Sequence, residues 1–371
     1  MICSKEKCVG CYSCINICPM RCIQMQEDIY GNIYPVIDES KCIGCKLCEK
    51  SCPANANIME SVPKKCFAGW AINDLDRKTS SSGGVASVIT EYIVKNKGVV
   101  YGAVIDPKKL TVEHRRIDTE QEISKLKKSK YVHSYIKDCY RQAEEDLNNG
   151  KKVLFTGTPC QIGGLKAFLK KDYNNLYTID IICHGVPNQK YLLEYIKSFG
   201  EIEDFDDYSF RDNSEYTFTL YNRGEVKKKI YYRESEYIMG FLTNLIQREN
   251  CFSCKYAKVE RVSDITLGDF WGIGKKEKFS YDTKNGVSVV LVNSSKGENL
   301  LNECEERLFL EQRQVVEAID GNTQLRTTIE RNNKMERFLK EYSKLGLKRT
   351  INKLLYKDFL KYKIRKKVRG Y

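Results

Sequence analysis

With 371 residues and 42% hydrophobic content, the chain is longer than one small domain, and two domains with an appendage are expected. No run of eighteen apolar residues occurs and the first residues lack a secretory-signal pattern, which argues against a secreted or membrane-spanning protein and predicts a cytoplasmic one. Most of the formal charge of +13 lies in residues 344–371, which carry eleven Lys or Arg and one Asp, so the charge indicates a basic tail rather than a basic body.

The seventeen cysteines are poorly explained by disulfides, because a reducing cytoplasm favours metal-binding or catalytic thiols. Eight of them form two runs with the spacing C-x2-C-x2-C-x3-C-P, which is typical of bacterial ferredoxins with [4Fe-4S] clusters. The repeat period is 34 residues, and the runs are Cys8, Cys11, Cys14 and Cys18, then Cys42, Cys45, Cys48 and Cys52.

In two-cluster ferredoxins the fourth cysteine of each run binds the cluster of the other run. This rule assigns one cluster to Cys8, Cys11, Cys14 and Cys52, and the other to Cys42, Cys45, Cys48 and Cys18. Zinc is the alternative, but its paired C-x2-C knuckles explain neither the third cysteine nor the Cys-Pro step. With strands expected over residues 23–26 and 32–37, a two-cluster ferredoxin fold is predicted for residues 1–62.

A helix is predicted after the segment SSSGG at residues 80–84, because apolar residues from Val85 to Ile93 recur at helical spacing. A serine N-cap and two glycines would let backbone N–H groups approach a flavin or nucleotide phosphate at the positive end of the helix. The alternative is an ordinary helix cap without a ligand. The pattern alone leaves both open.

Alternating strands and helices follow, which favours an α/β or α+β core. Strands are expected over residues 99–105, 153–155 and 176–182, with helices over 136–147 and from Pro159 onward. Cys160 and Cys183 each come directly after one of these strands. Ligands of open α/β sheets collect at the carboxyl ends of the strands, so both thiols are expected at a binding site.

Cys251 and Cys254 supply two more thiols on one loop, and with Cys160 and Cys183 they suffice for a third [4Fe-4S] cluster. Two alternatives stay open on spacing alone: cysteines that are simply buried, and a C-x2-C pair that holds zinc. The remaining cysteines lack partner spacing and are interpreted as structural; they are Cys3, Cys22, Cys66, Cys139 and Cys304.

From about residue 297 the pattern becomes helical, and the apolar positions of residues 335–345 and 351–359 each share a helix face. A basic amphipathic end could bind an acidic partner protein, an anionic membrane surface or nucleic acid, whereas the alternative is a solvated helix packed on its own domain. No helix-turn-helix or aromatic RNA-binding motif accompanies it, so nucleic acid is not an expected partner.

Three longer segments resemble the coenzyme F420 hydrogenase/dehydrogenase beta-subunit family: TGTPCQIGGL at 156–165, DIICHGVP at 180–187 and CFSCKYAKVERVSDITLGDFWG at 251–272. Residues 80–85 and KSKYVHS at 128–134 match as well, and the resemblance covers residues 1 to about 295. It implies a third cubane on Cys160, Cys183, Cys251 and Cys254, with FAD nearby in the same domain. The expected architecture is α+β, with a two-cluster ferredoxin fold (1–62), a mixed α/β flavin and iron-sulfur domain (63–295) and a helical basic tail (296–371).

For the flavin, the resemblance is combined with residue chemistry. Backbone N–H and hydroxyl groups suit the phosphates, a lysine adds a countercharge and a tyrosine ring can stack on the isoalloxazine. The expected contacts are Ser82, Gly83, Gly84, Ser129, Lys130, Tyr131, Gly157 and Thr158, with Asp269 and Trp271 lining the site. Lys130 could instead be a solvated surface charge, and residues 268–274 could be only a tight turn.

His184 directly follows Cys183 and is the predicted catalytic residue, since imidazole titrates near neutral pH and could supply a proton at flavin N5. The alternative is a buried, hydrogen-bonded histidine. Arg211 and Arg261 are expected to contact an anion or a substrate.

Three hypotheses for function follow. The first is an FAD- and [4Fe-4S]-dependent oxidoreductase subunit that exchanges electrons with a two-electron donor or acceptor, either the deazaflavin coenzyme F420 or another substrate, and with a redox partner protein. The second is a non-catalytic electron relay that supplies a partner enzyme, for example in polysaccharide biosynthesis. The third is a basic, colourless zinc protein that binds nucleic acid.

Overall fold

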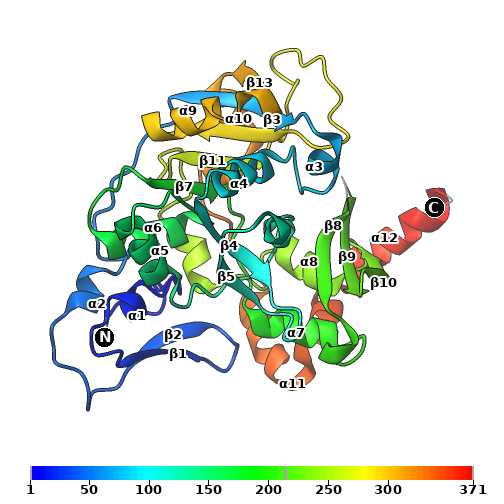
Figure 1. The fold of residues 1–371 in the computed structure, drawn as a ribbon. Helices are drawn as coiled ribbons and strands as arrows, with labels where there is room; N and C mark the ends of the chain where they lie inside the picture. The colour runs from blue at the N-terminus through cyan, green and yellow to red at the C-terminus, as the bar shows by residue number, and fades with distance from the viewer. Residues whose placement is uncertain (1, 213–214, 370–371) are drawn as a thin grey trace.

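The computed structural model describes residues 2–212 and 215–369 (Figure 1). The last two residues of the basic tail therefore lie outside the described part. The fold has three parts: the N-terminal module, an eight-stranded mixed sheet with helices on both of its faces, and a smaller three-stranded sheet. The expected mixture of a ferredoxin-like module, an α/β body and a helical C-terminal stretch is confirmed.

The same backbone geometry occurs in both cysteine runs of the N-terminal module. Its elements are α1 (Ser13–Ile17), β1 (Ile23–Glu27), β2 (Ile33–Ile37) and α2 (Leu47–Lys50), with β1 and β2 antiparallel. Each helix follows a left-handed residue, Tyr12 with φ 64° and Lys46 with φ 56°. Gly10 and Gly44 also have positive φ, 63° and 69°, a conformation that glycine adopts without a steric penalty. Two equivalent cysteine loops therefore lie beside one hairpin.

The main sheet has the order β13-β3-β12-β11-β7-β6-β4-β5. Its strands are β3 (Lys65–Ala71), β4 (Val99–Ile105), β5 (Val112–Ile117), β6 (Val153–Gly157), β7 (Leu176–Ile181), β11 (Ile265–Asp269), β12 (Ser288–Val292) and β13 (Leu308–Arg313). The central neighbours β4, β6, β7 and β11 are parallel, and the outer pairs are antiparallel. Parallel β6 and β7 place the chain segments that follow them at the same edge of the sheet.

Side chains alternate between the two faces of this sheet, as pleated strands require. Leu154 packs with α4 (Val85–Lys95) and α9 (Ser295–Asn302) on one face, whereas Val153 and Phe155 pack with α5 (Cys139–Asn148) and α6 (Pro159–Leu169) on the other. Tyr12 and Ile33 of the module join this second face. The module is therefore packed against α5 and α6, the helices before and after β6.

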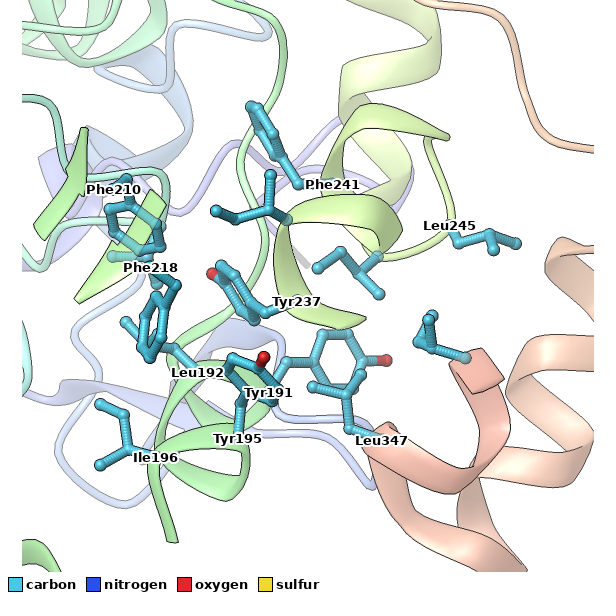
Figure 2. Packing of buried hydrophobic residues seen from close by; sticks show 14 of the residues in the cluster. Tyr191, Leu192, Tyr195, Ile196, Phe210, Phe218, Tyr237, Phe241, Leu245 and Leu347 are labelled. Carbon is cyan, nitrogen blue, oxygen red and sulfur yellow. The ribbon is translucent and has the colours of Figure 1, made fainter. Parts of the chain in front are cut away.

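A separate core joins the small sheet to the C-terminal helices. It involves β8 (Asp207–Asp212), β9 (Glu215–Asn222), β10 (Glu225–Tyr231), α7 (Gln189–Lys197), α8 (Glu236–Leu242) and α11 (Met335–Leu354). In Figure 2, Tyr195, Tyr237 and Phe218 point toward one another, and the Tyr195 ring centroid lies 5.0 Å from that of Phe218. Phe338 and Ile351 of α11 are fully buried in the same core. The first helix of the tail thus packs on its own domain.

The other helices are short or peripheral. They are α3 (Asp74–Lys78), α10 (Val315–Gly321), α12 (Tyr356–Arg369) and the 3-10 turns η1 (Glu120–Leu126), η2 (Ile202–Asp204), η3 (Glu249–Ser253), η4 (Glu305–Arg307) and η5 (Thr323–Leu325). In Figure 1, α12 extends from the body beside β10.

Two local expectations need correction. The helical extension expected from residue 296 is interrupted by β13, which pairs with β3 and carries the main sheet past residue 295. The predicted serine N-cap of α4 is wrong: Gly84, with φ 85°, precedes the helix and no side chain caps it. A further break occurs at Gly346, whose φ of 73° kinks α11 and lets the Leu347 N–H donate to Glu194 Oε1 at 2.6 Å.

Phe338→Ala is expected to lower the free energy of unfolding by about 3–5 kcal/mol, because it removes a fully buried ring from the core around α11. The matched control is Leu345→Ala on the same helix, whose side chain is 37% exposed and whose loss should cost about 1 kcal/mol or less. Urea unfolding under anaerobic conditions, followed by circular dichroism, measures both. Equal losses would contradict the packing of α11.

Candidate functional site

Four cysteines from both runs gather on one side of the module. Cys11 and Cys14 are buried, and burial, reinforced by the neighbouring thiols of the same set, raises the pKa of each. The set that the structure brings together is Cys8, Cys11, Cys14 and Cys52. It is the set that the exchange of fourth cysteines predicts.

The other four cysteines of the module line one cavity. It is lined by Cys18, Cys42, Cys45 and Cys48, together with Met20, Cys22, Ile43 and Lys46 among others. Cys45 is exposed, as are the apolar side chains of Met20 and Ile43. This outer set therefore lies at the surface of the module, and the set that contains Cys8 lies on the buried side.

The donor chemistry of both sets in the module fits iron-sulfur clusters. Each set consists of four cysteines, and a [4Fe-4S] cluster is held by four thiolates. Within the described ranges, no three His, Cys, Asp or Glu side chains converge closely enough to hold one metal ion.

A third cysteine set lines a cavity at the edge of the main sheet. Cys160 lies in the first turn of α6, where the Thr158 and Gln161 side chains form a capping box, and Cys183 follows β7. Cys251 belongs to η3 and Cys254 follows it directly. All four line the same cavity, and burial raises the pKa of Cys160 to about 12 and that of Cys251 to about 11.

The module is in direct contact with this third set. Val9, between two cysteines of the first run, lines the third cavity. A Cβ on Gly164 of α6 would lie 2.9 Å from Cys11 Sγ, so only glycine allows this approach. Tyr256 lines the cavity, and burial, then the nearby thiols of Cys160 and Cys11, raise its pKa. The buried cysteine set of the module therefore faces the third set across α6.

Two of the cysteines interpreted as structural touch the predicted ligands. Cys22 Sγ lies 3.4 Å from Cys18 Sγ and lines the same cavity. The Cys3 thiol interacts with those of Cys52 and Cys8. Cys66, Cys139 and Cys304 are buried away from the three sets, and burial raises the pKa of each to about 12.

The loops expected at the flavin phosphates lie side by side. The Ser129 N–H donates to Ser81 Oγ at 2.6 Å, which joins the loop before α4 to the KSKYVHS segment. The Ser82 hydroxyl is buried without a partner among the described residues, so it is free to bind a ligand. The Gly83 N–H, in contrast, donates to Ser288 Oγ at 3.0 Å. Of these groups, the Ser82 hydroxyl best fits a phosphate contact.

Three further residues predicted to contact the flavin, Lys130, Gly157 and Thr158, have neighbours within the protein. Lys130 Nζ donates to the carbonyls of Lys125 and Lys127, and burial lowers its pKa to about 8, so it is not a solvated surface charge. The Thr158 N–H donates to Gln161 Oε1, and Thr158 Oγ1 lies 3.2 Å from Cys160 Sγ. Gly157 precedes it at the end of β6. The structure thus places Gly157 and Thr158 beside the third cysteine set.

Aromatic rings and one ion pair connect three further residues that are expected to line a flavin. Tyr131 stacks on Phe241 with centroids 5.0 Å apart, and its pKa, raised by burial, also responds to Arg211 and Asp269. Arg211 Nη1 pairs with Asp269 Oδ2 at 2.7 Å. Trp271 is 48% exposed and stacks on Tyr216, which Arg211 also covers. The predicted residues Tyr131, Asp269 and Trp271 therefore lie in one connected group.

The two arginines expected at an anion or substrate are engaged within the protein. Arg211 forms the ion pair with Asp269. Arg261 is buried and pairs with the fully buried Asp180 at 3.0 Å, while its other N–H groups donate to backbone carbonyls and Thr266. Arg261 also lines the third cavity, so its contact with an anion or substrate stays a prediction.

His184 has a partner on each ring nitrogen. Nε2 lies 3.0 Å from Asn244 Oδ1, and Gln324 Nε2 lies 3.1 Å from Nδ1. This pair of amides fits a neutral ring that donates from Nε2 and accepts at Nδ1. Burial lowers the pKa of His184, which favours the same neutral form. The geometry is that of the alternative interpretation, a buried, hydrogen-bonded histidine.

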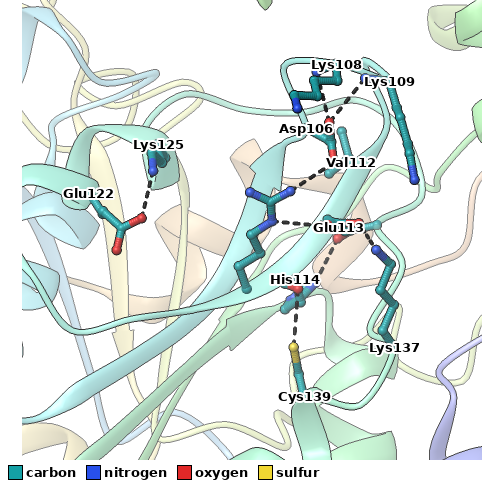
Figure 3. A network of polar contacts seen from close by, with 12 residues as sticks. Asp106, Lys108, Lys109, Val112, Glu113, His114, Glu122, Lys125, Lys137 and Cys139 are labelled. Atoms are coloured by element: carbon teal, nitrogen blue, oxygen red, sulfur yellow. Dashed lines mark hydrogen bonds and ion pairs between the residues drawn. The ribbon is translucent and has the colours of Figure 1, made fainter.

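The other two histidines of the chain, His114 and His133, are also buried, and burial lowers the pKa of both. His114 contacts Ser134 Oγ at 2.8 Å and the Thr156 carbonyl at 2.9 Å, and its own carbonyl accepts from the Cys139 thiol (Figure 3). Its pKa falls to about 4.

Acid is therefore expected to destabilise the native state through His114. The folded pKa of about 4 lies below the unfolded value of 6.5, so the stabilising contribution is complete above pH 6.5 and is lost as the pH falls toward 4. At pH 5 the loss is on the order of 2 kcal/mol. Thermal unfolding of the wild type and of His114→Gln between pH 7.5 and 5 measures it. The variant should lose less stability on acidification, and parallel pH profiles would contradict the assignment.

Comparison with known proteins identifies both parts of the chain. Residues 150–318 match the sequence model that describes the C terminus of the beta subunit in the coenzyme F420 hydrogenase/dehydrogenase family. Residues 7–56 match the 4Fe-4S dicluster domain. The chain carries a domain of this beta-subunit family. The resemblance inferred from the sequence is thus confirmed, and the chain is an iron-sulfur protein related to oxidoreductases.

Two similar proteins are named for their use of coenzyme F420. The coenzyme F420-dependent sulfite reductase of Methanocaldococcus jannaschii is 23% identical over 237 residues, which are 60% of this chain and 34% of that protein. The chain thus spans about a third of the length of this curated relative. A chain of the xenon-derivatised F420-reducing [NiFe] hydrogenase complex from Methanosarcina barkeri is similar with a TM-score of 0.48 and 17% identity, over 71% of this chain and 91% of that one.

Three residues that contact the cysteine sets were not predicted from the sequence. Cys22 lies four residues after Cys18, a spacing that could have drawn attention to it. Arg248 and Tyr256 flank the Cys251 and Cys254 pair in the sequence, but nothing there predicts their interactions with Cys8 and Cys11. Only the fold brings them to the dicluster module.

Proposed function

We propose that the chain is an FAD- and [4Fe-4S]-dependent oxidoreductase subunit that transfers electrons between a small two-electron donor or acceptor and a redox partner protein. One observation carries the proposal: four cysteines from three distant segments line a single cavity, and a residue of the dicluster module lines it with them. Four thiolates around one cavity suit a third [4Fe-4S] cluster on Cys160, Cys183, Cys251 and Cys254.

The three cysteine sets form a row from the surface to the main sheet. The outer set includes the exposed Cys45, the middle set includes Cys11, and the third set lies across α6 from Cys11. This order gives single electrons a route between the sheet and the surface of the module. We therefore expect the redox partner protein to exchange electrons next to Cys45, with Met20 and Ile43 in its contact area.

The flavin region supports a second redox group in the same domain. FAD would supply two-electron chemistry there. The clusters cannot supply it, because each of them transfers one electron at a time. The unpartnered hydroxyl of Ser82 and the neighbouring Ser129 suit its phosphates, while Tyr131, Asp269 and Trp271 would line the ring system. The protein's part is to position the ring system and exclude water. His184, held neutral by two amides, would stabilise the loop after Cys183 rather than exchange a proton.

Coenzyme F420 is the first donor to test, because the curated relative is named for its dependence on it. A function in the cytoplasm is proposed as well, and no helix in the described ranges has the length and apolar character needed to cross a bilayer. The second candidate is a relay without catalysis that feeds a partner enzyme, for example in polysaccharide biosynthesis; the surface position of Cys45 favours neither candidate over the other.

Anaerobically purified wild-type protein is expected to contain about 12 iron, about 12 acid-labile sulfide and about one flavin per chain. Cys160→Ser should hold only about eight iron, because it removes one ligand of the proposed third cluster. Cys304→Ser is the matched control, since that thiol is buried away from all three sets, and it should retain about 12 iron. A Cys160→Ser variant with about 12 iron would disprove the third cluster.

The flavin content separates the two candidates. Protein with about 12 iron that neither releases flavin nor binds added FAD would be a relay rather than a flavoenzyme. The proposed oxidoreductase is supported if reduced coenzyme F420 reduces the bound FAD and the clusters are reduced afterwards.

We also propose that the end of the tail contacts an anionic membrane surface. Tyr356, Leu360 and Ile364 lie one turn apart on α12 and are 62%, 41% and 54% exposed. Lys361 and Lys363, both exposed, flank this stripe. The opposite side of the helix is attached to the body, where Lys366 pairs with Glu234. An exposed apolar stripe bordered by lysines suits the interface of acidic lipids.

The double substitution Leu360→Glu with Ile364→Glu is expected to abolish co-sedimentation with phosphatidylglycerol vesicles, because it puts two carboxylates into the stripe. Val226→Glu, which alters a 58% exposed apolar side chain on β10, should leave binding unchanged. The wild type should not bind phosphatidylcholine vesicles. Equal binding of both lipids, or none to either, would refute the contact.

A further inference from the structure

Arg248 connects the dicluster module to the third cysteine set. Its side chain is 2% exposed, and Nη2 donates to the carbonyls of Cys8 and Ile33, both at 3.2 Å. Its own carbonyl accepts from the Cys251 N–H at 3.0 Å, and its N–H donates to the Val186 carbonyl. One residue therefore contacts the first cysteine loop with its guanidinium and the Cys251 loop with its backbone.

The guanidinium lies close against the module. A Cβ on Gly10, which lies between Cys8 and Cys11, would meet Arg248 Nη2 at 3.3 Å. Arg248 Nε donates to Asn250 Oδ1 at 3.3 Å, and the Tyr34 ring centroid lies 5.6 Å from the guanidinium carbon. These neighbours are carbonyl, amide and aromatic groups, and none of them carries a negative charge.

The positive charge of Arg248 has no carboxylate partner among the described residues, and its Nη1 has no hydrogen-bond acceptor there. The other buried arginines differ in this respect: Arg211 pairs with Asp269, Arg261 with Asp180 and Arg313 with Glu317. An unpaired buried charge is expensive, because its desolvation is not offset by a counter-ion. Arg248 therefore requires negative charge from another source.

Cysteines of two different sets lie within its electrostatic reach. They are Cys8, whose carbonyl accepts from its guanidinium, and Cys160 and Cys251. Cys8 belongs to the buried set of the module, and Cys160 and Cys251 belong to the third set.

We propose that Arg248 is the shared counter-ion of two clusters, the one on Cys8, Cys11, Cys14 and Cys52 and the one on Cys160, Cys183, Cys251 and Cys254, and that it raises the reduction potentials of both. This inference rests on the three clusters of the proposed function. A [4Fe-4S] cluster with four thiolates carries about −2 when oxidised and about −3 when reduced, so a buried positive charge stabilises the reduced form more.

The consequence concerns the transfer of one electron between the two clusters. One cluster is oxidised and the other is reduced by the same electron, and no bond or proton is exchanged. Because Arg248 contacts the loops of both, it stabilises the electron on either side of α6. Arg248 has no hydrogen bond to the loops of the outer cluster, so its charge should favour the electron on the two inner clusters.

The test is a redox titration of the anaerobic, iron-loaded full-length protein, followed by electron paramagnetic resonance. Arg248→Gln should make the reduction of both inner clusters about tenfold less favourable, which equals a shift of about 59 mV for a one-electron couple. Arg248→Lys keeps the charge and should retain most of the wild-type potentials. Arg331→Gln removes a 41% exposed arginine that pairs with Glu249 beside the same loop, and solvent screening should leave all potentials unchanged.

Asn250→Asp provides a second route if Arg248→Gln fails to fold. It keeps the arginine and places a carboxylate beside its Nε, which neutralises the guanidinium in place. Because it also removes the Asn250 Nδ2 donor 3.9 Å from Cys251 Sγ, the potential of the cluster on Cys8 gives the decisive reading. Both inner potentials should fall, including that of the cluster on Cys8. An iron-replete Arg248→Gln or Asn250→Asp variant with wild-type potentials would overturn the inference. A wild-type content of about eight iron would instead refute the third cluster and the proposed function with it.

Discussion

The four sulfurs of a cubane must surround a common volume, and no single segment of this chain can supply all four. In the dicluster module the problem is solved by exchange, because Cys18 faces the second loop and Cys52 faces the first. The hairpin of β1 and β2 lies beside both loops, and Arg141 of α5 holds the end of α1 by donating to the Ile15 and Cys18 carbonyls. In the α/β domain, the parallel strands β6 and β7 end at one edge of the sheet and place Cys160 and Cys183 beside Cys251 and Cys254, where the third cluster is proposed.

In the region between the cysteine sets, most buried ionisable groups are either paired with an opposite charge or kept neutral. Asp180 and Arg261 neutralise each other beneath the third cavity, and His133 and His184 are kept neutral by burial. Proton uptake at these groups is thereby disfavoured, which suits the movement of electrons without protons. Arg248 is the exception, because its positive charge has no carboxylate partner among the described residues. The negative charges of the two clusters proposed on either side of it would compensate for it.

The sequence predicted those features that depend on local spacing. The cysteine runs indicated the interlocked sets, and the apolar stretches located β4, β6 and β7 to within a few residues. Long-range contacts were beyond its reach. Asn244 and Gln324 occupy both nitrogens of His184, and carbonyls of a preceding turn hold Lys130, yet nothing in the sequence pairs these residues. Likewise β13 follows a helix in the chain, and only its pairing with β3 shows that it belongs to the main sheet.

The position of β3 has a consequence for synthesis at the ribosome. This strand directly follows the module, but both of its neighbours, β12 and β13, come from the far end of the domain. The module's own contacts are mostly local, so it can fold and take up iron early, as N-terminal units do during translation. The sheet cannot close around β3 until residue 313 has emerged. Iron of the proposed third cluster would therefore enter its cavity only after residue 313 has been synthesised.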